Sequence, residues 1–237
     1  MKYLDRARLD AIDADAFLGR DPYPWVNPSG LLTNDGYETL HANLPDLALF
    51  DRVFGKARKY GQKPHDRYSL EWQPGTPVPE PWRDFIAELE GAFYAASLRR
   101  LLGLDALRLR FHWHYTPSGC SVSPHCDAKR KLGSHIFYFN RSSEWNADWG
   151  GETLILDDCG RFDSDSHPDF DDFDRIEAGH CVDNHSLIFL RRSTSWHGVR
   201  EIRCPEGNMR KAFIVVFEKP ALMTRARALF RGGVSES

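Results

Sequence analysis

Six short apolar segments follow one another in the second half of the chain, and no helical pattern separates them. Each is rich in β-branched and aromatic residues or alternates between apolar and polar residues, as strands of an antiparallel sheet do. They lie between residues 106 and 218 and read ALRLRFHWHY, SHIFYFN, GGETLILD, HSLIFLRR, WHGVREI and RKAFIVVFE. Consecutive strands without crossover helices are typical of an antiparallel sandwich, barrel or jelly roll.

The first 104 residues have a different pattern, which predicts helices joined by Pro- and Gly-rich connectors. LDRARLDAIDADAFLG, residues 4–19, is amphipathic, and NDGYETLHANL, residues 34–44, begins with a helix-capping signal. The strongest pattern runs from Trp82 to Leu102, where apolar residues recur at helical spacing until Gly103 ends the predicted helix. Residues 21–30 and 73–81 are the connectors.

Together these segments predict a single domain of 237 residues, of the α+β class but mainly β. Residues 1–104 form a mainly helical support region, and residues 105–219 form the β core. Residues 220–237 form a C-terminal helix and tail, in which ALMTRARALFRG is the helical segment.

Composition argues against several classes of partner and compartment. The formal net charge of −3 gives no general attraction to nucleic acid or to an anionic membrane. No apolar run approaches the roughly 20 residues that span a bilayer, and the opening MKYLDRARLD lacks the apolar stretch of a signal peptide. The five cysteines form no CxxC pair, which argues against a disulfide framework or structural zinc and favours a reducing cytoplasm.

A histidine and an aspartate two residues apart, His125 and Asp127, are the first candidate metal ligands. Residues i and i+2 of a strand point to the same face, so these two side chains should project together. An imidazole and a carboxylate are two of the three ligands in 2-His-1-carboxylate sites of non-haem Fe(II) oxygenases. His167 and Asp169 have the same spacing, but their acidic, Pro-containing stretch has no strand pattern and predicts a solvated loop.

A third ligand should come from a distant strand, and His197 in STSWHGVREI is the candidate. The next segment begins with Arg210, and we expect its strand to pair with the His197 strand as a hairpin. An arginine that points inward from this strand can bind a carboxylate with its two-pronged guanidinium. Alternation places Arg210 and Lys211 on opposite faces, so Arg210 is preferred and Lys211 remains the competing residue.

In this order of motifs the sequence resembles the Fe(II)/2-oxoglutarate-dependent dioxygenases, and within that superfamily the prolyl-4-hydroxylase-like branch. The resemblance covers roughly residues 107–219, including the H-x-D pair, the Gly-Gly segment at 150–151, the distal histidine and the basic residue of the last strand. It implies a double-stranded β-helix, a cupin-like jelly roll, with an N-terminal helical layer. It also implies that His125, Asp127 and His197 are the catalytic iron ligands.

The resemblance assigns a second set of residues to the cosubstrate. Arg210 would bind the distal carboxylate of 2-oxoglutarate, Tyr138 would assist it, and Tyr115 would line the same pocket. Many relatives have Arg-x-Ser in the last strand, whereas this chain has Ala212 at the third position, so the hydroxyl near the cosubstrate is missing.

Other residues near these motifs have open interpretations. His112 and His114 share a strand face and are better explained as pocket-lining residues than as ligands. Cys126 points away from its two neighbours and is best explained as a small packed residue. Trp145 and Trp149 either cover the mouth of the site or anchor a loop.

The resulting functional hypothesis is hydroxylation of a C–H bond with Fe(II), 2-oxoglutarate and O2, and with ascorbate as a candidate reductant. Because nearer relatives modify proline in proteins, a prolyl or other peptidyl residue is the first substrate class, and a free amino acid or biosynthetic intermediate is the alternative. The aspartate-rich insert at residues 157–183 predicts a solvated loop that can attract a basic peptide. The rival classes are a non-catalytic metal sensor or interaction module, and isomerase or hydrolase chemistry with another metal.

Overall fold

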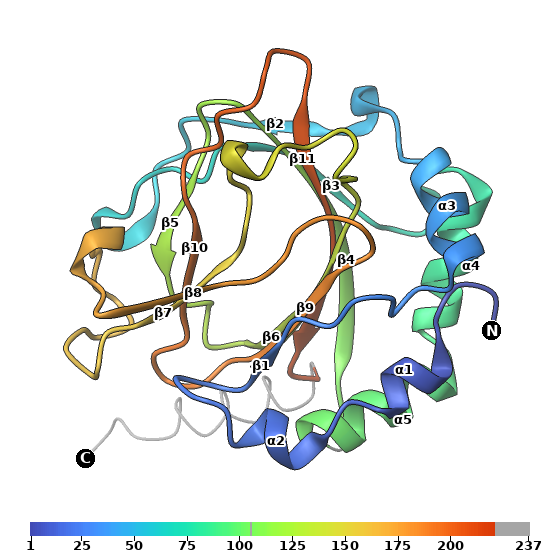
Figure 1. Cartoon of the computed structure of the whole chain (residues 1–237), viewed down its shortest axis with the longest axis horizontal. Helices are drawn as coiled ribbons and strands as arrows, with labels where there is room; N and C mark the ends of the chain where they lie inside the picture. Colours follow the sequence, from blue (N-terminus) through green and yellow to red (C-terminus); the bar gives the residue numbers. More distant parts are fainter. Residues whose placement is uncertain (105, 221–237) are drawn as a thin grey trace, which may run out of the picture.

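The six apolar segments of the second half form strands β4, β6, β7, β9, β10 and β11 in the computed structural model, which describes residues 1–104 and 106–220 (Figure 1). Strands β5 and β8 lie between them. The bounds of all these strands are β4 (Arg108–Pro117), β5 (Val122–His125), β6 (Lys131–Tyr138), β7 (Leu154–Asp157), β8 (Arg175–Ala178), β9 (Ser186–Leu190), β10 (Trp196–Val199) and β11 (Met209–Glu218). The sequence did not predict β8, because this edge strand has four exposed residues and therefore no apolar pattern.

Residues 1–104 supply five α-helices and also three strands that the sequence did not predict. The helices are α1 (Arg6–Asp10), α2 (Ala14–Leu18), α3 (Asn34–Ala42), α4 (Glu80–Leu89) and α5 (Ala92–Leu102). The strands are β1 (Trp25–Val26), β2 (Asp51–Val53) and β3 (Arg67–Glu71). Strands this short do not show a clear alternation of apolar and polar residues. They form because their backbones pair with neighbouring strands of the major sheet.

The helix predicted from Trp82 to Leu102 is two helices, because the chain turns at Gly91. Gly91 has an extended ψ of 162° and caps the start of α5. The apolar period continues across this break, so the pattern could not reveal it. Gly103 ends α5 in the left-handed conformation, with φ of 63°, as predicted.

The strands pair into two antiparallel sheets with the strand orders β1-β9-β6-β11-β4-β3-β2 (the major sheet) and β5-β10-β7-β8 (the minor sheet). In Figure 1 the helices lie on one side of the major sheet and the minor sheet lies on the other. This architecture confirms the predicted jelly roll with a helical layer. No helix in the described part of the chain is long and apolar enough to cross a membrane, and the predicted helix at 221–232 lies outside the described residues.

The last two strands do not form the hairpin that the sequence predicted. β10 pairs with β5 and β7 in the minor sheet, whereas β11 pairs with β4 and β6 in the major sheet. The segment 200–208 therefore crosses from one sheet to the other. As a consequence, His197 and Arg210 line the same cavity from opposite walls.

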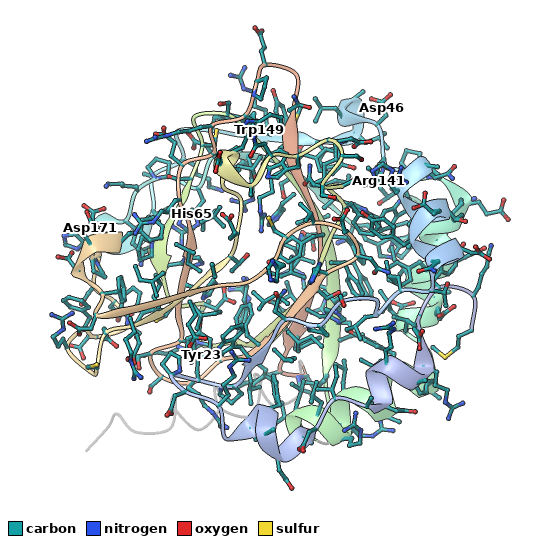
Figure 2. The ribbon with its side chains drawn as sticks, in the orientation of Figure 1. Tyr23, Asp46, His65, Arg141, Trp149 and Asp171 are labelled. Carbon is teal, nitrogen blue, oxygen red and sulfur yellow. The ribbon has the colours of Figure 1, made fainter. Side chains whose placement is uncertain are left out.

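Within the insert at residues 157–183, residues 175–178 form β8 of the minor sheet and the segment before them covers the outer face of that sheet. Phe173 packs against Trp196, the residue before the distal histidine, with ring centres 5.7 Å apart. At the edge of the molecule, Asp169 forms an ion pair with Lys63 at 2.6 Å, and the Asp171 side chain is 94% exposed (Figure 2). The insert is therefore partly a packed cover and partly an exposed acidic loop.

Candidate metal centre and its cavity

Two strands of the minor sheet bring His125, Asp127 and His197 together. β5 ends at His125, which is the Cα partner of His197 in the antiparallel pair of β5 with β10. Asp127 follows two residues after His125. One ligand atom from each side chain lies within 4.8 Å of the other two, and all three residues are buried. This is the only such group of metal-binding side chains within residues 1–104 and 106–220.

The backbone orients both imidazoles so that one nitrogen is left for a metal. Nδ1 of His125 lies 3.0 Å from the carbonyl oxygen of Ser123, and Nδ1 of His197 lies 3.0 Å from that of Ser195. Because a carbonyl can only accept, each Nδ1 carries the proton and each Nε2 keeps a free lone pair. Burial lowers the pKa of both rings below the ordinary value, so both are neutral at pH 7.

Nearby cations keep the carboxylate of Asp127 in its charged form. Its Oδ1 accepts a hydrogen bond from Nζ of Lys131 at 2.7 Å, and its backbone oxygen accepts one from Nε of Arg191 at 2.7 Å. Burial alone would raise the pKa of Asp127, but Lys131, His197 and Arg191 outweigh it, and the pKa lies below its ordinary value. Two neutral imidazoles and one carboxylate form a donor set that suits Fe(II).

The three side chains line one wall of a cavity of about 660 Å³ between the two sheets. The opposite wall is the inner face of the major sheet, which is apolar near its centre, at Ile136, Ile214 and Phe189, and polar toward β3 and β4. The volume lies within the range of roughly 300–1,000 Å³ that is usual for ligand sites.

Arg210 is buried in this cavity without a carboxylate partner. Its Nε donates to the carbonyl oxygen of Gly151 at 2.5 Å, and its Nη2 donates to Oγ1 of Thr153 at 3.1 Å. The hydroxyl of Tyr138 donates to the same Oγ1 at 2.8 Å, and the guanidinium lies 5.2 Å from the centre of the Tyr138 ring. No described residue forms an ion pair with Arg210. Since a buried unpaired guanidinium is destabilising, this arrangement favours an anionic ligand.

Thr153 is a site residue that no sequence motif identified. Its hydroxyl lies 3.1 Å from Nη2 of Arg210 and lines the cavity, whereas Ala212 offers no hydroxyl. Because its oxygen accepts from two neighbours, its own hydrogen is free to donate into the cavity. The Gly-Gly segment just before it was the available signal, since Gly151 has φ of 104° and a side-chain carbon there would lie 3.3 Å from the Trp145 ring and 3.4 Å from Cδ of Arg210.

Of the residues considered for the cosubstrate, Tyr138 contacts Arg210 and Thr153 without lining the cavity itself, whereas Tyr115 and Lys211 lie on the other face of the major sheet. Tyr115 packs on Phe50 in the core on the other face of β4, with ring centres 4.4 Å apart, and its hydroxyl donates to the carbonyl oxygen of Pro45 at 3.4 Å. Lys211 lies on the opposite face of β11 from Arg210, as alternation predicted, and does not line the cavity. The structure therefore does not bring Tyr115 or Lys211 to the candidate metal centre.

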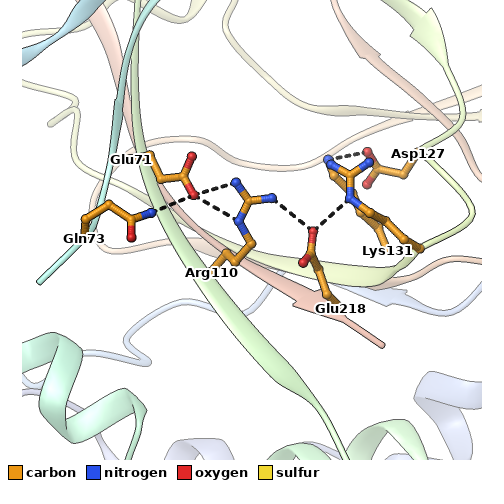
Figure 3. Close-up of polar contacts among 7 residues, drawn as sticks. Glu71, Gln73, Arg110, Asp127, Lys131 and Glu218 are labelled. Atoms are coloured by element: carbon orange, nitrogen blue, oxygen red, sulfur yellow. Dashed lines mark hydrogen bonds and ion pairs between the residues drawn. The ribbon is translucent and has the colours of Figure 1, made fainter. Parts of the chain in front are cut away.

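His112 and His114 line the cavity but lie outside the group of metal-binding side chains, as expected. Burial lowers the pKa of both rings, that of His112 to about 4. Beside them Arg110 lies between Glu71, at 2.5 Å, and Glu218, at 3.2 Å (Figure 3). The far end of the cavity therefore has cations and carboxylates that neutralise one another.

His65, in the loop before β3, was not predicted to lie at the site. Its ring centre is 4.5 Å from that of His125, and its Nε2 lies 3.1 Å from Oγ of Ser123. Figure 2 shows it beside β5 and β10. Burial lowers its pKa to about 3, so the ring is neutral at pH 7. No sequence pattern marked it, because its segment has no strand or helix period.

The remaining candidates have structural roles. Burial raises the pKa of the Cys126 thiol to about 12, which makes it a poor nucleophile at neutral pH. Trp145 packs with Trp149 and Val199 and donates from Nε1 to the carbonyl oxygen of Gly150 at 2.8 Å. The two tryptophans therefore anchor the loop before β7, and neither lines the cavity.

No family model and no curated protein matches this sequence. Among solved structures, a prolyl-4-hydroxylase from Pseudomonas putida superposes with a TM-score of 0.61 at 17% identity, over 91% of this chain and 99% of that one. A prolyl hydroxylase from Trichoplax adhaerens, in complex with a peptide fragment of the hypoxia inducible factor oxygen degradation domain, gives 0.63 at 13% identity over 98% and 94%. The non-heme alpha ketoglutarate dependent epimerase SnoN from nogalamycin biosynthesis gives 0.59 at 15% identity over 91% and 84%.

These likenesses establish the fold, and the site is established by the chain's own side chains. The protein has the fold of these prolyl hydroxylases and of the SnoN epimerase, and its own His125, Asp127 and His197 form a buried group that could hold a metal ion.

Proposed function

We propose that this protein is an Fe(II)- and 2-oxoglutarate-dependent oxygenase that hydroxylates a C–H bond. The observation that carries the proposal is the buried group of His125, Asp127 and His197, with its ligand atoms within 4.8 Å of one another on the wall of a cavity. The fixed Nδ1 protons and the charged carboxylate leave this group ready to hold a divalent ion.

The proposed site for 2-oxoglutarate lies across the cavity from these ligands. Arg210 would bind the distal carboxylate, with the Thr153 hydroxyl as a donor beside it, and Tyr138 would assist by donating to Thr153 and so orienting that hydroxyl. Ile136 and Ile214 would contact the carbon chain. Bound iron supplies the redox chemistry that couples oxidative decarboxylation of 2-oxoglutarate to substrate oxidation, while the protein positions both molecules and excludes water.

Two substrate classes fit this proposal. A prolyl or other peptidyl residue is the first, and the Trichoplax enzyme, solved with a peptide, supports it. A small molecule is the second, and the enzyme from nogalamycin biosynthesis supports that alternative.

We place the protein in the cytoplasm, since all five of its cysteines are free.

The direct test is succinate release from 2-oxoglutarate after anaerobic loading with Fe(II) and exposure to air. The wild type should release succinate slowly without substrate, ascorbate should prolong turnover, and His125→Ala should abolish release because it removes a metal ligand. An iron-loaded wild type that binds Fe(II) but releases no succinate would instead indicate a metal sensor. A protein that binds metal but not 2-oxoglutarate would indicate isomerase or hydrolase chemistry.

A further inference from the structure

The mouth of the cavity is strongly basic. Toward solvent the cavity joins a second hollow of about 620 Å³, and the two share Arg58, His65, Arg67 and Asp127. The hollow has two carboxylates, Asp127 and Asp165, against six cations: Lys56, Arg58, Lys59, Arg67, Lys129 and Arg191. Since Asp127 is a candidate metal ligand, the mouth has a clear excess of positive charge.

Apart from Arg210, which faces the proposed cosubstrate site, the cations deeper in the cavity have carboxylate partners. Arg110 forms ion pairs with Glu71 and Glu218, and Arg130 pairs with Glu218 at 3.1 Å (Figure 3). Lys131 pairs with Asp127 at 2.7 Å. These groups need no ligand to balance their charge.

Arg58 and Arg67 have no such partner, although both are partly buried. Arg58 donates from Nε and Nη2 to the Gln62 side chain, at 3.2 and 3.1 Å. Arg67 donates from Nη1 to the carbonyl oxygen of His65 at 2.8 Å, while its Nε is buried without a hydrogen-bond partner among the described residues. The neighbouring Asp66 instead accepts the backbone N–H of Gly55 at 2.8 Å.

The charge of Arg58 acts unfavourably on Arg67. Burial lowers the pKa of Arg67, the charge of Arg58 lowers it further, and Asp66 opposes both without outweighing them. Burial also lowers the pKa of Arg58 and outweighs the opposing effect of Asp127. An anion bound beside the two guanidiniums would relieve this unfavourable interaction.

We propose that Arg58 and Arg67 bind an oxyanion, a carboxylate or a phosphate, carried by the substrate whose C–H bond is oxidised. Arg67 is bonded to the backbone of His65, and the His65 ring packs on the metal ligand His125, so the anion would be held beside the metal centre. This inference rests on the proposed function. It also replaces the expectation of a cationic substrate, because the acidic insert contributes only Ser164 and Asp165 to the mouth.

The first test is binding without turnover. Inorganic phosphate and acetate are titrated calorimetrically into metal-free wild type, Arg58→Gln/Arg67→Gln and Arg210→Ala. Phosphate, acetate or both should bind to the wild type and to Arg210→Ala, and affinity should fall at least about tenfold in the double variant. The anion that binds with the higher affinity indicates whether the substrate carries a phosphate or a carboxylate. Equal binding to the wild type and the double variant would overturn the proposal.

The second test uses substrate-stimulated succinate release. Compounds are screened as pairs, carboxylate with carboxamide and phosphate ester with parent alcohol, and only the anionic members should stimulate release. The double variant should raise the KM of the stimulating compound at least about tenfold, and this rise should be much larger than any change in the cosubstrate KM. Arg67→Lys should recover part of the loss, because it restores the charge. Arg130→Gln is the matched control, since Arg130 lines the same cavity but is already paired.

These results separate the two proposals. A stimulating substrate that is neutral or cationic, or a cosubstrate KM that rises as much as the substrate KM in the double variant, would overturn the substrate-anion site and leave the oxygenase function standing. Anion binding that depends on Arg58 and Arg67, in a protein that releases no succinate when loaded with iron, would overturn the oxygenase function instead.

Discussion

At the scale of single residues, the site depends on which buried charges have partners. Lys131 neutralises the carboxylate of Asp127 within the cavity. Arg210 has only neutral acceptors, the Gly151 carbonyl and the Thr153 hydroxyl. Because an unpaired buried charge is destabilising, Arg210 should bind an anion more strongly than any exposed cation of the chain.

Arg210→Ala should therefore weaken 2-oxoglutarate binding by about 100-fold, as expected for loss of a charge-assisted bidentate pair. The measurement is an anaerobic titration of the metal-loaded protein with 2-oxoglutarate. Lys211→Ala is the matched control, because Lys211 is adjacent but lies on the other face of β11, and it should leave affinity unchanged. A larger effect at Lys211 than at Arg210 would contradict this assignment.

Residues with a fixed place in a motif could be predicted from the sequence, whereas residues defined only by proximity could not. His125, Asp127 and His197 were found because strand alternation and the family order of motifs agree. His65 and Thr153 reach the site through the fold alone. For Tyr115, strand alternation and the family resemblance lead to different predictions. Alternation places Tyr115 with Trp113 on the helix-facing side of β4, whereas the resemblance places it in the cosubstrate pocket. The structure agrees with alternation.

At the scale of elements, the metal centre depends on close packing of β10 between β5 and β7. Gly198 follows the ligand His197, and a side-chain carbon there would lie 2.7 Å from the backbone oxygen of Val122 and 2.9 Å from the ring of Phe170. The phenylalanine can move, but the backbone of β5 cannot move without shifting His125. A glycine at this position therefore sets the spacing of the two histidines.

Gly198→Ala should destabilise the protein by about 1–3 kcal/mol through overpacking. It should also lower Fe(II) affinity by at least about tenfold, because the two imidazoles are displaced. Urea unfolding and anaerobic metal titration measure the two effects. Gly179→Ala is the control, since its added carbon would meet only the Asn27 side chain. Wild-type metal affinity in Gly198→Ala would show that the strand spacing is not limiting.

Long elements were easier to predict than short ones or their pairing. β4 and β11 are ten residues each and have clear alternation, so the sequence predicted both. β1 and β8 have too few buried residues to form a pattern. The crossing of residues 200–208 between sheets could not be read either, because local patterns identify strands but do not determine which distant strand each one pairs with.

At the scale of the whole molecule, the helical layer supports the site from behind. Aromatic side chains of α4, among them Trp82 and Phe85, pack on Phe213 of β11, on the opposite face of that strand from Arg210. The layer also buries a polar contact, in which the Tyr94 hydroxyl of α5 lies 2.9 Å from Nδ1 of His135 in β6. Because His135 is buried and its Nε2 has no hydrogen-bond partner among the described residues, a charge on this ring would be destabilising.

Burial lowers the pKa of His135 to about 3, whereas an unfolded histidine titrates near 6.5. The unfolded state therefore binds an extra proton below pH 6.5, and the free energy of unfolding should fall by up to about 1.4 kcal/mol per pH unit from this residue as pH drops toward 5. The variant His135→Leu/Tyr94→Phe removes both partners, so its free energy of unfolding should depend less on pH, by up to about 1.4 kcal/mol per pH unit. Urea unfolding of the metal-free protein at pH 7, 6 and 5 measures this. His167→Gln, in an exposed loop, is the control and should leave the slope unchanged. If the free energy of unfolding depended on pH equally in the wild type and the double variant, His135 would take up its proton in the folded protein as readily as in the unfolded chain.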